Sequence, residues 1–145
     1  MNIKIINQGK DISRVIINDP KTYNSLSSKN LLDLIKVFKQ LDNDKNIKVI
    51  ILEGSGKEFS AGHNLKEVRG LKKKMKYQKL FNLCSKLMLQ IVEGRKPVIA
   101  KVHGAAYAAG CQLVASCDLA YSTNDAKFAT PGVNIGLFCS TPMVA

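Results

Sequence analysis

The sequence predicts an α/β fold in which helices pack on a sheet, and two features of its pattern support this. Short β-branched runs such as KVIILEG (48–54) and PVIAKV (97–102) are typical of buried strands. Segments with apolar residues at helical spacing stand between such runs, and this alternation is typical of layered α/β domains. With 145 residues, the chain has the length of a single domain over residues 1–145.

Two short strands and a helix are expected first. The runs IKIIN (3–7) and ISRVIIN (12–18) are separated by a turn at Gly9, which is typical of neighbouring strands. Ser27 or Ser28 can then cap a helix that extends to about residue 42. One face of that helix carries apolar residues at helical spacing: Leu31, Leu34, Ile35, Phe38 and Leu41.

The middle of the chain predicts a strand, a glycine-rich loop and two helices. The loop is GSGKEFSAG (54–62). Asn64 and Glu67 then have the spacing of a helix cap and its partner, and predict a short helix through residue 68. After the basic GLKKKMK (70–76), a longer helix is expected over about 75–93, ended by Gly94. Its apolar residues recur at helical spacing: Leu80, Leu83, Cys84, Leu87, Met88 and Ile91.

The last third predicts shorter elements. The strand at 97–102 is followed by a turn at Gly104, a helix rich in small residues around 109–116, and strands near 118–122 and 126–129. The final residues, GLFCSTPMVA (136–145), have the pattern of another helix start.

Composition restricts the classes of partner. The net charge of +11 suits a polyanionic partner such as RNA, an acidic membrane surface or a phosphorylated cofactor, although a lysine-rich chain can also reflect AT-rich coding. No apolar run approaches the roughly 18 residues of a membrane span, so no membrane insertion is expected. The N-terminal residues show neither an apolar signal core nor a transit-peptide composition, which predicts a cytoplasmic location.

The cysteines predict reduced thiols rather than a metal site. The four residues Cys84, Cys111, Cys117 and Cys139 form no C-x-x-C pair and stand in apolar surroundings. With only two histidines in the chain, a metal site is not expected.

Two loops share one design, in which a buried strand leads through small residues into a helix start. They are IILEGSGKEFSAGHNL (50–65) and VIAKVHGAAYAAGCQL (98–113). The first N–H groups of a helix lack intrahelical partners. Two such termini that converge could form an oxyanion hole, in which backbone donors stabilise a carbonyl oxygen that gains charge. Close packing of helix against strand also selects Gly and Ala, so each loop by itself leaves both interpretations open.

Taken together, the motifs resemble the crotonase (enoyl-CoA hydratase/isomerase) superfamily in order and spacing. The resemblance spans about residues 10 to 142, and AAGCQLVASCD (108–118) with FATPGVN (128–134) resembles one poorly characterised branch. The motifs that carry it are PKTYNSL (20–26), FSAGHNL (59–65), PVIAKVHGAAYAAGCQL (97–113), CDLA (117–120), FATP (128–131) and IG (135–136).

The resemblance implies a spiral of ββα turns that lacks the family's C-terminal helical part. It implies an acyl-CoA partner whose thioester oxygen lies between the backbone N–H groups of His63 and Ala109, the latter flanked by Gly110. No cofactor is implied beyond the coenzyme A thioester itself, as substrate or ligand. A homo-oligomer, a trimer or a dimer of trimers, is implied as well. Positions matching the family's CoA and substrate contacts are Lys21, Thr22, Tyr23, Ala61, Asn64, Leu65, Tyr107 and Pro131.

The sequence departs from the family at both acid–base positions. Family hydratases use two glutamates, and here Gln112 and Gly132 occupy those places. Neither residue can transfer a proton near neutral pH. A general acid or base typically contributes a factor of about 10²–10⁴ to a rate. Hydration is therefore expected to be weak or absent, which leaves open a non-standard acyl-CoA reaction such as hydrolysis or decarboxylation, or a non-catalytic acyl-CoA-binding fragment.

An RNA-binding role is the alternative from another class. Lys29, Lys36 and Lys39 line one helical face, with Lys45 and Lys48 beyond it, and resemble the lysine-rich helix of one RNA-binding family member. Aromatic residues for base stacking are not interleaved with these lysines, so solvated lysines are the preferred interpretation and nucleic acid is disfavoured.

Four further side chains have simple expectations. The imidazole of His63 can face the pocket or be accommodated outside it, whereas His103 and Asp118 are expected in packing and structural roles. Cys139, beside Ser140, would need an activating neighbour to act as a nucleophile, and a buried thiol is the preferred interpretation.

Overall fold

The computed structural model describes residues 2–136, so the helix expected at 136–145 lies outside the described residues apart from Gly136. A five-stranded sheet has the order β1-β2-β3-β4-β6. β1 is antiparallel to β2, and each remaining pair of neighbours is parallel. The strands are β1 (Ile3–Gln8), β2 (Ile12–Ile17), β3 (Val49–Gly54), β4 (Val98–Val102) and β6 (Leu119–Ser122).

A second, smaller sheet and two isolated bridges pair successive turns of the chain in the same order as the large sheet does. It contains β5 (Ala105–Tyr107) paired in parallel with β7 (Lys127–Ala129). Isolated bridges join Ser60 to Ala106 and Leu26 to His63. Each turn of the chain thus contributes once to the large sheet and once to this second row of pairings. The expected α/β architecture, a spiral of ββα turns, is confirmed.

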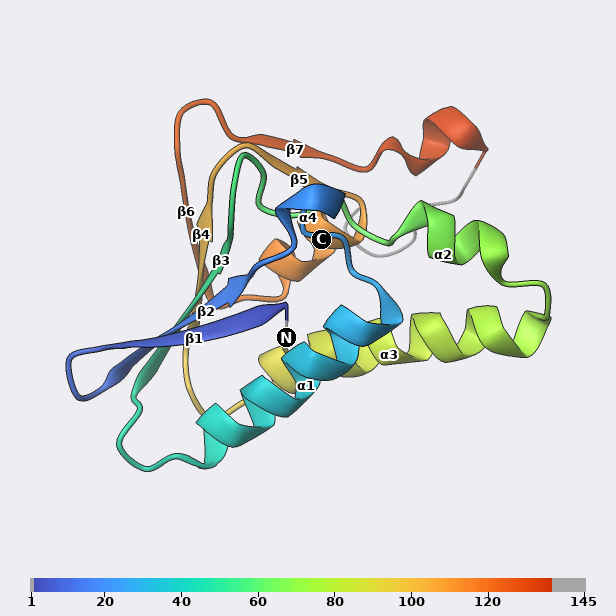
Figure 1. Cartoon of the computed structure of the whole chain (residues 1–145). Coiled ribbons are helices and arrows are strands. Elements are labelled where there is room, and N and C mark those ends of the chain that lie inside the picture. Colours follow the sequence, from blue (N-terminus) through green and yellow to red (C-terminus); the bar gives the residue numbers. More distant parts are fainter. Residues whose placement is uncertain (1, 137–145) are drawn as a thin grey trace.

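Two long helices cover the large sheet. α1 (Ser28–Asn43) and α3 (Lys74–Val92) pack against each other, as Figure 1 shows. The apolar residues expected on their inner faces are buried, except that Leu83 is only partly buried. Shorter helical segments connect the remaining parts: η1 (Pro20–Thr22), α2 (Leu65–Gly70), α4 (Ala109–Ala115) and η2 (Pro131–Ile135).

The structure differs from the sequence expectations at the shortest elements. β5, η1 and η2 were not expected, although strands as short as β7 were. Asn64 caps α2 as expected by accepting from the Glu67 N–H at 3.1 Å. The Glu67 carboxylate, however, accepts from the Ser28 N–H at 2.9 Å instead of returning to the cap. Glu67 therefore connects α2 to the start of α1.

The outer edge of the large sheet is exposed. All four residues of β6 are exposed, including Leu119 at 55% and Tyr121 at 68% of their surface. Phe128 on β7 and Val133 in η2 are also exposed, at 47% and 58%. No described helix is long and apolar enough to cross a lipid bilayer.

Candidate functional site

The two glycine-rich loops lie in direct contact. The Ser60 N–H donates to the Ala105 carbonyl at 3.0 Å, and the Tyr107 N–H donates to the Ser60 carbonyl at 2.9 Å. A Cβ on Gly110 would lie 2.4 Å from the Ser60 carbonyl oxygen, so only glycine allows this approach. The close-packing interpretation of Gly110 is therefore correct, and the packing itself brings the two helix starts together.

Gly62 places the two candidate donors in neighbouring backbone segments. Its φ is +84°, and a Cβ there would lie 2.7 Å from the backbone carbonyl oxygen of Tyr107 and 3.0 Å from the backbone nitrogen of Ala109. His63 follows Gly62 directly. Within residues 2–136, neither the His63 N–H nor the Ala109 N–H donates to another group of the chain. Two free donors thus belong to loops that hydrogen bonds and packing hold in register.

Ala108 is held in a strained backbone conformation immediately before α4. Its φ of +49° and ψ of −120° lie in a region that non-glycine residues rarely adopt, at a typical cost of about 1–3 kcal/mol. Its N–H donates to the Ala129 carbonyl at 2.8 Å, and its carbonyl accepts from the Gln112 N–H at 3.0 Å. This turn sets the orientation of the Ala109 N–H. The sequence expectations did not single out Ala108, because a strained φ leaves no sign in residue type when the residue is alanine.

The His63 imidazole is accommodated against neighbouring elements. Its ring meets the Phe81 ring edge-on, with centroids 5.2 Å apart, and its Nδ1 lies 3.3 Å from the Leu26 carbonyl oxygen. Burial lowers its pKa, although the Leu26 carbonyl and the Glu67 carboxylate act in the opposite direction. Since a carbonyl only accepts, Nδ1 is a ring nitrogen that carries a proton. The lowered pKa keeps the ring neutral at pH 7. The ring therefore anchors the residue whose N–H is a candidate donor.

The segments expected to contact CoA are joined by hydrogen bonds. The Ala61 N–H donates to the Tyr23 carbonyl at 2.9 Å, and the Leu26 N–H donates to the Gly62 carbonyl at 2.7 Å. Asn64 donates to the Ser25 hydroxyl at 3.3 Å. Residues 21–26 and 61–64 consequently run side by side, although about 40 residues separate them in the chain.

Most side chains in these segments remain accessible. Lys21 and Ala61 are exposed, Tyr23 is 58% exposed and Leu65 is 62% exposed. Thr22 is partly buried and donates to the Asp19 carboxylate at 2.8 Å. Tyr107 and Pro131, at the end of β5 and the start of η2, are partly buried.

Asn24 is a structural residue of the site that the sequence interpretation passed over. It is fully buried, and its amide donates to the carbonyls of Ser55 and Glu58, both at 2.7 Å. Its side-chain oxygen accepts from the Asp19 N–H at 3.0 Å. Asn24 therefore connects η1 to the first glycine-rich loop. The motif PKTYNSL contains this asparagine, and the last three residues of the motif, Asn24, Ser25 and Leu26, are all buried.

Gln112 and Gly132, which the resemblance places at the family's two glutamate positions, supply no acid or base. Gln112 is partly buried on α4, and no hydrogen bond within residues 2–136 engages its side-chain amide. Gly132 is buried in η2, which follows β7 by two residues. The hydrogen bond from the Ala108 N–H to the Ala129 carbonyl brings the start of α4 beside the end of β7. Gln112 on α4 and Gly132 in η2 therefore both follow closely in the chain after this point of contact.

The remaining candidate side chains have structural roles. The Asp118 carboxylate accepts from the Val98 N–H at 2.7 Å and so ties β6 to the start of β4, as expected. A ring nitrogen of His103 lies 3.0 Å from the Gly56 carbonyl oxygen. Burial raises the pKa of the Cys84 thiol to about 11 and that of Cys117 to about 12, so both stay protonated. Cys139 and Ser140 lie outside the described residues.

Two hollows lined by described residues lie along α3, one of them between α3 and α1. One groove of about 700 Å³ is lined by Ile35 and Lys39 of α1 and by Leu89 and Gln90 of α3, among others. None of the residues expected to bind the thioester lines it. The chemical case for the site therefore rests on the backbone geometry at His63 and Ala109, not on a formed cavity.

Comparison with known proteins points to one family. Residues 7–144 match the family described as enoyl-CoA hydratase/isomerase. The chain is 47% identical over 143 residues to enoyl-CoA hydratase domain-containing protein 3, mitochondrial, of Xenopus laevis, covering 99% of this chain and 49% of that protein. The Homo sapiens protein of the same name is 46% identical over 134 residues, covering 92% of this chain and 44% of that protein.

Solved structures agree. An enoyl-CoA hydratase from Mycobacterium smegmatis has a TM-score of 0.95 at 45% identity, covering 99% of this chain and 56% of that one. The human enoyl coenzyme A hydratase domain-containing protein 3 has a TM-score of 0.93 at 42% identity, with the same coverage of 99% and 56%. The chain spans about half the length of the curated relatives that it matches.

The names of these relatives contradict the expected cytoplasmic location. The relatives from Xenopus laevis, Rattus norvegicus and Homo sapiens are all named as mitochondrial, so the expectation drawn from the N-terminal residues is wrong. The family resemblance seen in the motifs, in contrast, is confirmed over nearly the whole sequence. On the family match and on the identity to several relatives, the chain belongs to the enoyl-CoA hydratase/isomerase family.

Proposed function

We propose that this chain binds acyl-CoA thioesters and holds the thioester oxygen between the backbone N–H groups of His63 and Ala109. One observation carries the proposal: both groups lack a partner within residues 2–136, although the loops that bear them are packed together through Gly62 and Gly110. Pre-aligned backbone donors of this kind stabilise an oxygen that gains negative charge.

The pantetheine and nucleotide portion of CoA would lie along the paired segments 21–26 and 61–65. Their backbones are joined through Ala61 and Tyr23, while the side chains of Lys21, Tyr23 and Leu65 remain exposed. Lys21 supplies a charge for a phosphate, and Leu65 with Tyr23 supplies apolar surface. Tyr107 and Pro131 would border the acyl group beyond the thioester.

The chemistry proposed at this site is not an efficient hydration. Gln112 and Gly132 provide no group that can add or remove a proton at the double bond, so the two amides would polarise the thioester without acid–base help. The side-chain amide of Gln112, which no residue between 2 and 136 engages, could hydrogen-bond a polar acyl substituent or a water molecule. The activity that follows is acyl-CoA binding with little or no hydratase turnover.

A titration with three ligands tests the oxyanion hole. Calorimetry would compare butyryl-CoA, its thioether analogue S-butyl-CoA and free CoA at about 0.15 M salt, where loose charge attraction is screened. Two lost hydrogen bonds to the carbonyl oxygen should make the thioether bind about 30-fold more weakly than the thioester. Equal affinity for thioester and thioether would show that the amides of His63 and Ala109 do not hold the carbonyl.

A gain-of-function variant tests the role of Gln112. Gln112→Glu returns one carboxylate to the family's acid–base position and should raise crotonyl-CoA hydration by about 10²-fold over the unaltered chain. The loss of enoyl absorbance measures the rate. Gln112→Ala is the matched control and should stay at the original rate, and a Gln112→Glu chain that is equally inactive would contradict the placement of this residue beside the substrate.

We also propose that the protein acts in mitochondria, as the names of its relatives indicate for them. Fractionation of cells that express the full-length protein, followed by protease protection of isolated mitochondria, would test this. Recovery in the cytosolic fraction would reject it.

A further inference from the structure

The strongest concentration of unneutralised charge lies on α2, α3 and their connection. From Val68 to Val92 the sequence contains no Asp or Glu, although it contains seven Lys or Arg. These cations are Arg69, Lys72, Lys73, Lys74, Lys76, Lys79 and Lys86. A run of 25 residues with only one sign of charge is unusual in a chain that also holds 11 acidic residues.

The structure leaves these cations without acidic partners. All seven side chains are exposed, and none forms an ion pair with a described residue. Four cations elsewhere among the described residues do form ion pairs, among them Lys29 with Asp33 at 2.8 Å and Arg95 with Asp42 at 3.0 Å. Glu67, the acidic residue directly before the segment, accepts from the Ser28 N–H, and the next acidic residue, Glu93, lies at the far end of α3.

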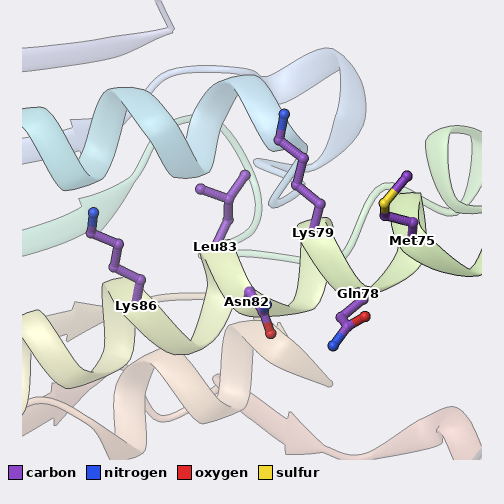
Figure 2. Close-up of a pocket in the computed structure, with 6 residues that line it drawn as sticks. All are labelled: Met75, Gln78, Lys79, Asn82, Leu83 and Lys86. Atoms are coloured by element: carbon purple, nitrogen blue, oxygen red, sulfur yellow. The ribbon is translucent and has the colours of Figure 1, made fainter.

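An exposed apolar side chain stands among these charges. Met75 is 75% exposed in the first turn of α3, one turn before Lys79. Figure 2 shows Met75 and Lys79 at the α2 end of α3, beside a shallow hollow, with Lys86 further along the helix. Leu65, at the start of α2, is 62% exposed. We call the surface formed by Arg69, Lys72, Lys73, Lys74, Met75 and Lys76 the basic corner.

The basic corner projects from the molecule. In Figure 1, α2 and the start of α3 extend to the right, away from the five-stranded sheet. A projecting surface is suited to a flat partner rather than to a small ligand, which needs a concave site. The partner must also be densely anionic, because at least five neighbouring cations remain to be neutralised.

We propose that the basic corner docks on an anionic lipid bilayer. Four to eight Lys or Arg on one helical segment are typical of proteins that bind acidic lipid headgroups. Met75 distinguishes a bilayer from RNA, since an exposed thioether can enter the acyl boundary while the lysines contact phosphates. The basic corner contains no aromatic side chain on which bases could stack.

Vesicle co-sedimentation with charge-matched variants tests the proposal. The vesicles contain phosphatidylcholine alone or with about 30% phosphatidylglycerol, at about 0.1 M salt. The test variant is Lys72→Glu, Lys73→Glu and Lys74→Glu together. The control, Lys36→Glu with Lys45→Glu and Lys48→Glu, changes the net charge equally at exposed lysines that form no ion pair with a described residue. Circular dichroism checks that each variant is folded.

The expected result is binding to the anionic vesicles only, weakened about a hundredfold in the test variant and changed little in the control. Met75→Asn should weaken the binding that survives at about 0.5 M salt, where charge attraction is screened. Equal losses in the test and control variants would show that net charge acts without a defined surface, and would overturn the proposal. Binding to an oligouridine but not to the vesicles would also overturn it. The outcome does not depend on acyl-CoA binding.

Discussion

At the scale of single residues, three backbone positions build the candidate thioester site. Gly62 and Gly110 allow two loops to approach more closely than any Cβ would permit. Ala108 adopts a positive φ directly before α4, and the Ala109 N–H that follows donates to no other residue of the described part of the chain. Their contribution is conformational, because none of these residues offers a side-chain functional group.

The first residue-scale prediction concerns Gly62. Gly62→Ala would place a Cβ 2.7 Å from the backbone carbonyl oxygen of Tyr107, at a residue whose φ is +84°. We therefore expect the free energy of unfolding to fall by about 2 kcal/mol or more. We also expect the variant to lose butyryl-CoA binding. Urea denaturation and calorimetry measure the two effects. Gly70→Ala is the control, since nothing lies within 4 Å of a Cβ at that position. Equal stability of the two variants would contradict the close approach of the loops.

The second concerns the pH dependence at His63. Burial holds its pKa below the ordinary value, so the unfolded chain binds this proton more readily than the folded chain. Stability should therefore decrease as pH falls below about 6.5. Denaturation of His63→Gln at several pH values should show a smaller decrease than the unaltered chain. His103→Gln, which keeps His63, should retain the decrease, and an identical pH profile for all three proteins would contradict the role of His63.

At the scale of elements, the helix starts differ in how they are capped. The Ser27 hydroxyl accepts from the Asn30 N–H at 3.2 Å at the start of α1, and Asn64 caps α2. The N-cap residue of α3 is Lys73, which makes no side-chain capping bond, and the first turn of α3 contains cations and no acid. Cations at a helix N-terminus oppose the helix dipole. α3 therefore gives up local stability at the place where the proposed lipid surface needs charge.

Restoring a cap to α3 should separate stability from membrane binding. Lys73→Asp adds a capping carboxylate at a residue that already has extended backbone, and should stabilise the fold by about 1 kcal/mol. The same change should weaken binding to anionic vesicles. Thermal denaturation and co-sedimentation measure the two quantities, with the mid-helix variant Lys36→Asp as control, for which no gain in stability is expected. A destabilised Lys73→Asp chain would contradict this account of the α3 start.

At the scale of the whole molecule, the β6 edge of the large sheet presents exposed apolar side chains. β6 is exposed along its length, and Leu119, Tyr121 and Phe128 present large apolar side chains there. An edge strand with an apolar exposed surface is a site for association. This supports the homo-oligomer that the family resemblance implied, and we propose that this surface lies in a contact between subunits.

Light scattering after size-exclusion chromatography tests that contact. The molar mass measured for the unaltered chain should exceed 15.9 kDa, the mass of one copy. Leu119→Lys together with Tyr121→Lys should shift it toward that mass, because charged side chains at an apolar contact are costly to bury. Met75→Lys provides a control at an exposed apolar residue outside this surface. Elution of the unaltered chain as a single copy would reject the proposal.

Most of the fold could be predicted from the sequence because its larger elements carry strong local signals. The apolar periodicity of α1 and α3 and the β-branched runs of β3 and β4 matched the structure to within a few residues. Motif spacing, through the resemblance, also placed the chain in its family. β5 was missed, since its pairing depends on β7, a strand about 20 residues away. The location was also mispredicted, because composition at the N-terminus is an indirect signal.

The sequence by itself determined the residue types available for chemistry: two loops rich in small residues, Gln112 and Gly132 where the resemblance implies glutamates, and a long basic segment without acids. Only the tertiary structure decided what these residues contact. Hydrogen bonds between residues tens of positions apart join the two loops, strain at Ala108 sets the Ala109 N–H, and Glu67 is drawn away to Ser28. These contacts depend on packing between segments that are far apart in the chain, and the type and local spacing of residues do not predict such packing.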